Sequence, residues 1–284
     1  MGDAYSKFEN IIQEYWDNKG TTNAERVFWD DTKKVLLNYE LLELLLTKSV
    51  DDGDSAQSGA LAKGLDLWIA EELRAAGFVE EEVWPRLHEP RVVDPSVFRF
   101  VEKLPKKLSS ELLEHIERSG SAEAKVQGAV YTKQVDVGMS SWLSGPEILI
   151  STKTMSRAYG KNLGNRFEEA YGDAVNLKKR YPLAAFGFFF LVNAEIADSD
   201  SDLSKAITML RKLQEEEGAY DTSALLLVDF SSNRVRVPKQ PSGIPQSLSP
   251  ESFFASIVDI VLVNGPIDAH PGAHEKMNSA FVKI

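Results

Sequence analysis

Two short, almost wholly apolar segments in the second half of the chain constrain the fold most strongly. Residues 184–193 (AAFGFFFLVN) and residues 224–230 (ALLLVDF) each have the length of one strand. A strand that is apolar on both faces has to be covered on both, as in a parallel sheet between layers of helices. We therefore expect a buried sheet whose core includes the phenylalanines of the first segment, Phe186, Phe188, Phe189 and Phe190.

Patterns for helices and further strands surround these two segments. In residues 159–181, apolar side chains recur at three- and four-residue spacing, which is typical of a helix, and Pro182 ends the pattern. The expected order is helix 61–77, strand or hairpin 125–138, strand 147–153, helix 159–181, strand 184–193, helix 203–217, strand 224–230 and helix 250–263. This order predicts an α/β fold with a mixed central sheet flanked by helices.

The first 60 residues are interpreted as a helical N-terminal extension to a core of residues 61–284, with an insertion at 79–118. We expect helices at 5–16, 24–46 and 109–118, a loop at 51–58, irregular connections at Pro85, Pro90 and Pro95, and weak order in the final 20 residues. The leucines at the end of the second helix favour either a dimer interface or packing onto the core. Those leucines are Leu41, Leu42, Leu44, Leu45 and Leu46.

Composition excludes several classes of site. The chain has no cysteine, so disulfides, thiolate zinc sites and cysteine nucleophiles are excluded, and its four histidines do not form an HExxH pair. The formal net charge of -11 argues against a non-specific DNA coat protein, although a local basic cleft remains compatible with it. No charged-then-apolar leader and no apolar run of roughly 20 residues is present, so we expect a cytoplasmic protein without a membrane partner.

Asp136, Ser151 and Lys153 form the pattern that carries the functional interpretation. Asp136 lies in VDVG near the end of one expected strand, and ISTK ends the next strand with Lys153. Ser151 and Lys153 are two residues apart, so both project from the same face of that strand. Hydrolysis of a phosphodiester needs an activated water and a stabilised leaving oxygen, which a carboxylate-bound Mg²⁺ supplies and a neighbouring lysine assists.

At this point the sequence resembles a known superfamily. The run VDVG, 12 residues, STK, followed by a helix and an apolar strand, is similar to the PD-(D/E)xK nucleases of restriction enzymes and DNA-repair proteins, over residues 61–230. The resemblance implies a restriction-endonuclease-like fold, Mg²⁺ as cofactor and DNA as substrate. It also implies catalytic roles for Asp136 and Lys153, with Asp136 as a metal ligand.

The sequence departs from the usual motif at Ser151, where the superfamily has Asp or Glu. A subset of restriction enzymes has Ser-x-Lys and takes its second acid from the following helix, which here points to Glu168 or Glu169. Glu169 shares a polar flank of that helix with Arg166, so polarity favours it slightly. Arg157 matches one base-reading position of that subset, but Tyr159 and Gly160 replace the expected acid–arginine pair, so no recognition sequence is implied.

Glu72 is a further candidate for the site. It falls on the apolar face of the expected helix 61–77, where an unpaired carboxylate is costly. A metal ion or a basic partner would explain its position, and in the superfamily a helix before the first core strand often supplies an acid. The alternative is that Glu72 reaches water near the helix end. The candidate catalytic set is therefore Asp136, Ser151, Lys153, Glu168, Glu169 and Glu72, with the four acids as candidate metal ligands.

Basic residues cluster after the motif. Residues 153–180 hold seven lysines and arginines against three acids, in a chain that is acidic as a whole. Such a segment is typical of a phosphate-facing patch, so Arg157, Lys161 and Arg166 are candidate DNA-binding residues. The alternative is a charged helix face that serves solubility.

The leading hypothesis is a magnesium-dependent DNA endonuclease, of a type II-like restriction kind, that cuts double-stranded DNA as a homodimer. One alternative is a catalytically inactive member of the same fold that binds DNA or a protein. The other is an unrelated acidic α/β interaction protein.

Overall fold

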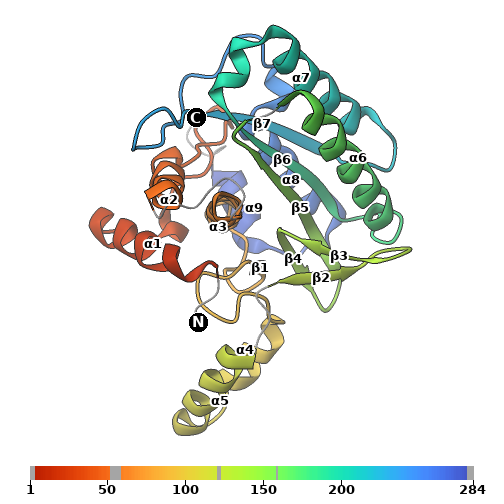
Figure 1. Ribbon diagram of the computed structural model, residues 1–284. Helices are drawn as coiled ribbons and strands as arrows, with labels where there is room; N and C mark the ends of the chain where they lie inside the picture. The colour runs from red at the N-terminus through yellow and green to blue at the C-terminus, as the bar shows by residue number, and fades with distance from the viewer. Residues whose placement is uncertain (1–3, 52–58, 120–122, 158, 280–284) are drawn as a thin grey trace.

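A mixed sheet of five strands forms the centre of the structure (Figure 1). The structure is a computed structural model that describes residues 4–51, 59–119, 123–157 and 159–279. The sheet order is β1 (Val83–Trp84), β4 (Val137–Ser141), β5 (Gly145–Met155), β6 (Ala185–Asn193) and β7 (Thr222–Val228). Strands β1, β4 and β5 run antiparallel, whereas β5, β6 and β7 run parallel. The predicted mixed α/β architecture is confirmed at this level.

Helices cover both faces of the sheet, as the apolar strands require. Helices α3 (Ala60–Ala75) and α8 (Pro250–Asn264) pack on one side, here called the α3 face. Helices α6 (Tyr159–Lys178) and α7 (Asp200–Glu215) pack on the other, here called the α6 face. Every residue of β6 and β7 is buried, so the expectation of strands covered on both faces is confirmed.

The phenylalanines of β6 divide between the two faces. Phe186, Phe188 and Phe190 belong to the apolar cluster of the α6 face, and Phe189 belongs to that of the α3 face. There the ring of Phe189 meets Trp68 of α3 edge-on, with 5.9 Å between the ring centroids. All four phenylalanines are fully buried, as predicted for core residues.

The N-terminal helices pack onto α3. Helices α1 (Ser6–Lys19) and α2 (Tyr39–Asp51) lie beside α3 in Figure 1, and their apolar residues share one cluster with the α3 face of the sheet. As a result almost every residue of α3 is buried, on all sides of the helix and not on one side only. Of the leucines in α2, four are fully buried and therefore pack onto the core: Leu41, Leu42, Leu45 and Leu46.

The predicted helix at 24–46 is wrong over its first half. A single 3-10 turn, η1 (Asn23–Glu25), is followed by extended chain and a turn, and the helix begins only at Tyr39. The carboxylate of Asp30 causes the turn, because it accepts hydrogen bonds from the peptide N–H groups of Thr32 and Lys34. Asp favours such local bonds over helix continuation.

The insertion and the C-terminal region also differ from expectation. The insertion contributes β1 to the sheet edge, and its helices α4 (Pro95–Glu102) and α5 (Lys106–Ser119) project from the body (Figure 1). Pro95 begins α4 instead of marking an irregular connection, with Asp94 as the N-cap that accepts the Ser96 N–H. Helix α9 (Pro271–Ser279) lies in the region expected to be weakly ordered. Most of the expected loop at 51–58 lies outside the described residues.

A small second sheet completes the architecture. Strands β2 (Ala124–Gln127) and β3 (Thr132–Val135) form an antiparallel hairpin, and β3 leads directly into β4 through Asp136. The hairpin lies beside the central sheet in Figure 1. Within the described residues, no helix is long and apolar enough to cross a membrane.

Gly187 of β6 provides a test of the core packing. A methyl group at this position would lie 2.5 Å from the ring of Phe253 on α8, which is fully buried against Phe189 and Phe254. We expect Gly187→Ala to lower the free energy of unfolding by about 1–3 kcal/mol, as for other overpacked cores. Urea denaturation measures this change.

Gly164 in α6 is the matched control, because a methyl group there would meet no atom within 4 Å. Gly164→Ala is expected to raise stability by up to about 1 kcal/mol through helix propensity. Equal unfolding midpoints for the two alanine variants would contradict this description of the core.

Candidate active site

The candidate site lies where β4 separates from the hairpin, at Asp136. Val135 packs in the apolar cluster of the α6 face and Val137 in that of the α3 face, so the chain changes side at this residue. The Asp136 side chain turns to β5, where its Oδ2 accepts the Thr152 N–H at 2.9 Å and the Ser151 hydroxyl at 3.4 Å. Asp136 therefore lies directly beside the segment that carries Lys153.

A second carboxylate, Asp66 of α3, reaches the same point from the α3 face. The hydroxyl of Thr152 donates to Asp66 Oδ1 at 2.6 Å, so one threonine binds Asp66 through its side chain and Asp136 through its backbone. The Asp66 side chain also lies 3.3 Å from the Tyr5 hydroxyl and 3.4 Å from the Lys63 ammonium. Burial, and then the charge of Asp136, raise the pKa of Asp66 to about 7.

Sequence reasoning missed Asp66. A single apolar stripe on the helix 61–77 places Asp66 away from the core, between Leu65 and Leu67. In the structure, α1 and α2 cover that outer side, and Asp66 is completely buried. The available signal was an acid between two leucines. That signal indicates a buried acid only once the N-terminal helices are known to cover this side of the helix.

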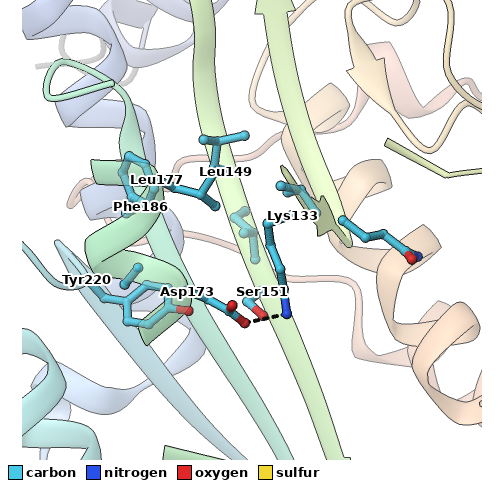
Figure 2. Close-up of a pocket in the computed structure, with 11 residues that line it drawn as sticks. Lys133, Leu149, Ser151, Asp173, Leu177, Phe186 and Tyr220 are labelled. Atoms are coloured by element: carbon cyan, nitrogen blue, oxygen red, sulfur yellow. Dashed lines mark ion pairs between the residues drawn. The ribbon is translucent and has the colours of Figure 1, made fainter. Parts of the chain in front are cut away.

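Ser151 and Lys153 both face α6, in agreement with their spacing on one strand. Lys153 Nζ lies 4.0 Å from Glu169 Oε1 on α6. Ser151 lines a small cavity of about 20 Å³ with Tyr220, Lys133 and Asp173 (Figure 2). Such a cavity holds no more than about one water molecule, so it is too small to bind a substrate molecule.

Lys133 of β3 is a second lysine at the site that the sequence analysis did not identify. Its ammonium lies 2.5 Å from Asp173 Oδ2 and 3.7 Å from Glu169 Oε1, both on α6. Partial burial lowers the pKa of Lys133, but the hydrogen bond and charge of Asp173 and the charges of Glu169 and Asp136 outweigh it and raise that pKa. Lys133 therefore stays a cation beside Asp136.

Asn176 of α6 fixes the hairpin that presents Lys133. Its Oδ1 accepts the N–H groups of Val130 and Tyr131 at 2.8 and 3.2 Å, and its Nδ2 donates to the Tyr131 carbonyl at 2.9 Å. Gly128 allows this contact, since any larger residue there would overlap the Asn176 amide. The hairpin is thereby held in one position on α6.

Tyr220, two residues before β7, is buried and lines the same small cavity as Ser151. Burial raises the pKa of Tyr220, and the charges of Asp173, Asp136 and Glu169 raise it further, so the hydroxyl stays protonated. Asp173, Asp136 and Glu169 therefore all lie close enough to Tyr220 for their charges to raise its pKa.

The other predicted residues on and before α6 take different positions. Glu168 is exposed and forms no ion pair within the described part of the chain. Arg166 contacts Glu169 at 3.5 Å, and Arg157 is exposed after β5. The side chain of Lys161 lies outside the described residues. Of the two glutamates left open by the sequence, Glu169 is the one that lies next to Lys153.

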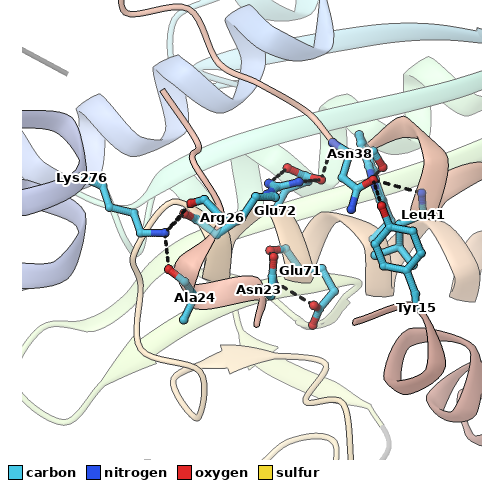
Figure 3. Close-up of polar contacts among 11 residues, drawn as sticks. Tyr15, Asn23, Ala24, Arg26, Asn38, Leu41, Glu71, Glu72 and Lys276 are labelled. Atoms are coloured by element: carbon cyan, nitrogen blue, oxygen red, sulfur yellow. Dashed lines mark hydrogen bonds and ion pairs between the residues drawn. The ribbon is translucent and has the colours of Figure 1, made fainter. Parts of the chain in front are cut away.

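Glu72 is buried in a separate polar network. Arg26 binds both of its carboxylate oxygens, and Oε1 also accepts the Asn38 N–H at 3.0 Å (Figure 3). Lys276 of α9 caps the same region, donating to the carbonyls of Ala24 and Ala75 at 2.6 and 2.8 Å. Burial raises the pKa of Glu72 and Arg26 counteracts this, so the arginine accounts for the buried carboxylate without a metal.

The acids near Asp136 do not form a complete metal cage. Among the described residues, no group of three acidic or histidine side chains is arranged to hold a metal ion. Asp66 and Asp136 do form a pair, and Mg²⁺ is often bound by only one or two carboxylates together with waters and substrate phosphate. Two neighbouring carboxylates repel each other, and a cation that both of them bind removes this repulsion. The pair therefore fits an Mg²⁺ ion that keeps several water ligands, and not an ion whose ligands all come from the protein.

Comparison with known proteins adds no relative. No protein-family model, no curated protein and no solved structure matches the chain. The interpretation of the site therefore rests on its own geometry.

The raised pKa of Asp66 predicts how stability depends on pH. In the folded protein this carboxyl keeps its proton to about pH 7, whereas in the unfolded chain it loses the proton near 3.8. The contribution of Asp66 to the free energy of unfolding is therefore fully present below about pH 4, and it is lost as the pH rises through 7. We expect Asp66→Asn to gain stability relative to the parent protein across that interval and to keep a constant advantage above it.

Denaturation in EDTA-containing buffers from pH 4 to pH 8 measures this difference. Glu217→Gln, which changes an exposed carboxylate, serves as the control and is expected to show little pH dependence relative to the parent. A stability difference between Asp66→Asn and the parent that does not change with pH would contradict the assignment.

Proposed function

We propose that the chain is a magnesium-dependent DNA endonuclease, a type II-like restriction enzyme with a restriction-endonuclease-like core. One observation carries the proposal: Thr152 joins the carboxylates of Asp66 and Asp136 on the strand that presents Lys153. The order α3, β4, β5, α6, β6, with β4 and β5 antiparallel and β6 parallel to β5, is consistent with such a core.

Asp136 and Asp66 are the residues that we propose as Mg²⁺ ligands. When bound, the ion supplies a Lewis acid and lowers the pKa of an attacking water. Ser151, in place of the usual acid, donates its hydroxyl to Asp136 and helps to fix the orientation of that carboxylate. In this assignment the second carboxylate comes from the helix before the core strands, and neither Glu168 nor Glu72 is a ligand.

Lys153 supplies the positive charge at the reacting phosphate. Its ammonium orients the attacking water and stabilises the charge that develops on the phosphate oxygens. Among the described residues its ammonium has a long contact with Glu169, at 4.0 Å, which a substrate phosphate would replace.

Double-stranded DNA is the proposed partner, bound by a homodimer at a two-fold symmetric site. Arg157, Lys161 and Arg166 are proposed to contact backbone phosphates. Because four leucines of α2 are buried in the core, a dimer would have to use a different surface. A cytoplasmic location belongs to the same proposal.

A catalytically inactive member of the same fold is the second candidate. Two observations favour it: Ser151 replaces an acid, and no third carboxylate completes the metal site in the described residues. Such a protein would bind DNA or a protein partner without cleaving DNA.

Incubation with plasmid and phage DNA, with and without Mg²⁺, tests the nuclease proposal. Discrete Mg²⁺-dependent fragments are expected from the parent protein. Asp136→Asn, Asp66→Asn and Lys153→Ala are each expected to lower the cleavage rate by at least about 100-fold, the usual effect of losing such a group.

Lys125→Ala is the matched control, because Lys125 is an exposed lysine of the same region, on β2. It should cleave at nearly the parent rate. Absence of cleavage by the parent on every substrate, with DNA binding retained, would favour the inactive relative.

A further inference from the structure

Three cations from three different elements surround one carboxylate, that of Glu169. Lys133 of β3 and Lys153 of β5 lie 3.7 and 4.0 Å from its Oε1, and Arg166 of α6 lies 3.5 Å from its Oε2. The side chains of both lysines are largely buried, with 24% and 18% exposed, whereas that of Glu169 is 43% exposed. The fold therefore holds the two lysines in place, whereas Glu169 and Arg166 both face solvent.

The contacts to Glu169 are long. Charge-assisted hydrogen bonds between ammonium and carboxylate groups are usually about 2.7–2.9 Å. Lys133 makes its short contact to Asp173 instead, at 2.5 Å, and only its second contact is to Glu169. Glu169 is thus attracted by the three cations but is not fixed by any of them, so another anion is able to replace it.

We propose that Lys133, Lys153 and Arg166 form a binding site for a phosphate group, and that the Glu169 carboxylate occupies this site in the free protein. The proposal deepens the proposed function and rests on it for the identity of the natural ligand, a DNA phosphate. A phosphodiester carries the same single negative charge on two non-bridging oxygens, and beside Lys133 it would lie near Asp136. Glu169 is then an internal competitor of the substrate and not a metal ligand.

Asp173 and Asn176 are positioning residues in this arrangement. Asp173, which is buried, keeps the ammonium of Lys133 on the α6 face, and the Tyr131 hydroxyl donates to its Oδ1 at 3.2 Å. Asn176 fixes the hairpin that carries Lys133. Both residues act through Lys133, which Asp173 binds and whose hairpin Asn176 fixes.

Binding of inorganic phosphate to the full chain, without DNA and without Mg²⁺, tests the proposal. Removing the internal competitor in Glu169→Gln is expected to tighten phosphate binding about three- to tenfold, the range that loss of a few partly exposed ion pairs would give. Calorimetry and the phosphate dependence of Tm report this affinity.

Glu168→Gln is the matched control, since it makes the same change of charge at the neighbouring, exposed position. A gain confined to Glu169→Gln supports the site. An equal gain in both variants, no gain, or weaker phosphate binding together with weaker Mg²⁺ binding in Glu169→Gln overturns it.

The cations are tested in the Glu169→Gln background. Adding Lys133→Met or Arg166→Gln is expected to abolish the gain, whereas Lys133→Arg should keep most of it and Lys125→Met should keep all of it. Because Lys133→Met leaves Asp173 unpaired and could unfold the protein, Arg166→Gln, at an exposed position, gives an independent answer. Retention of the gain in Arg166→Gln and in a folded Lys133→Met variant overturns the proposal.

The two proposals fail separately. A phosphate gain in Glu169→Gln with no cleavage of DNA by the parent protein would support the phosphate site and reject the endonuclease. Cleavage by the parent with no phosphate gain in Glu169→Gln would support the endonuclease and reject Glu169 as its internal competitor.

Discussion

The double hydrogen bond of Thr152 is the interaction on which the candidate site depends. Thr152 of β5 donates its N–H to Asp136 and its hydroxyl to Asp66, and so binds both carboxylates although their charges repel each other. Burial first, and then the charge of Asp136, raise the pKa of Asp66 to about 7, so this carboxyl keeps its proton below that pH. A buried pair of carboxylates is costly, and the cation binding proposed above would account for it.

The packing of the whole N-terminal region serves this arrangement. Asp66 is buried because α1 and α2 cover the outer side of α3, and Tyr5 just before α1 contributes a hydroxyl to its surroundings. On the opposite face, α6 holds the β2–β3 hairpin and surrounds Lys153 with acids and bases. Asp66 therefore approaches Thr152 from the α3 face, whereas Ser151 and Lys153 of the same strand face α6. Within the described residues, α1, α2 and Tyr5 are therefore part of the core that surrounds Asp66.

Much of the fold was predictable because its signals are local. The apolar strands β6 and β7, the helix α6 and the strand of Lys153 follow from periodicity and from Pro182. The start of α2 was not predictable from periodicity, because the side chain of Asp30 competes with helix formation before Tyr39. Asp66 and Lys133 were missed for another reason: their importance arises only from contacts between segments far apart in sequence. Glu72 carried a correct signal, a buried acid that needs a partner, but the partner is Arg26.

The most direct test of the account is a calorimetric titration of Mg²⁺ into the metal-free protein at pH 8, where Asp66 is ionised. The account predicts that Asp66→Asn and Asp136→Asn each weaken Mg²⁺ binding by at least about tenfold, since even residues that only support metal ligands often have effects of that size. Glu72→Gln, in the same helix as Asp66, should bind Mg²⁺ like the parent protein. Unchanged Mg²⁺ affinity in Asp66→Asn, or a loss confined to Glu72→Gln, would contradict the pairing of Asp66 with Asp136.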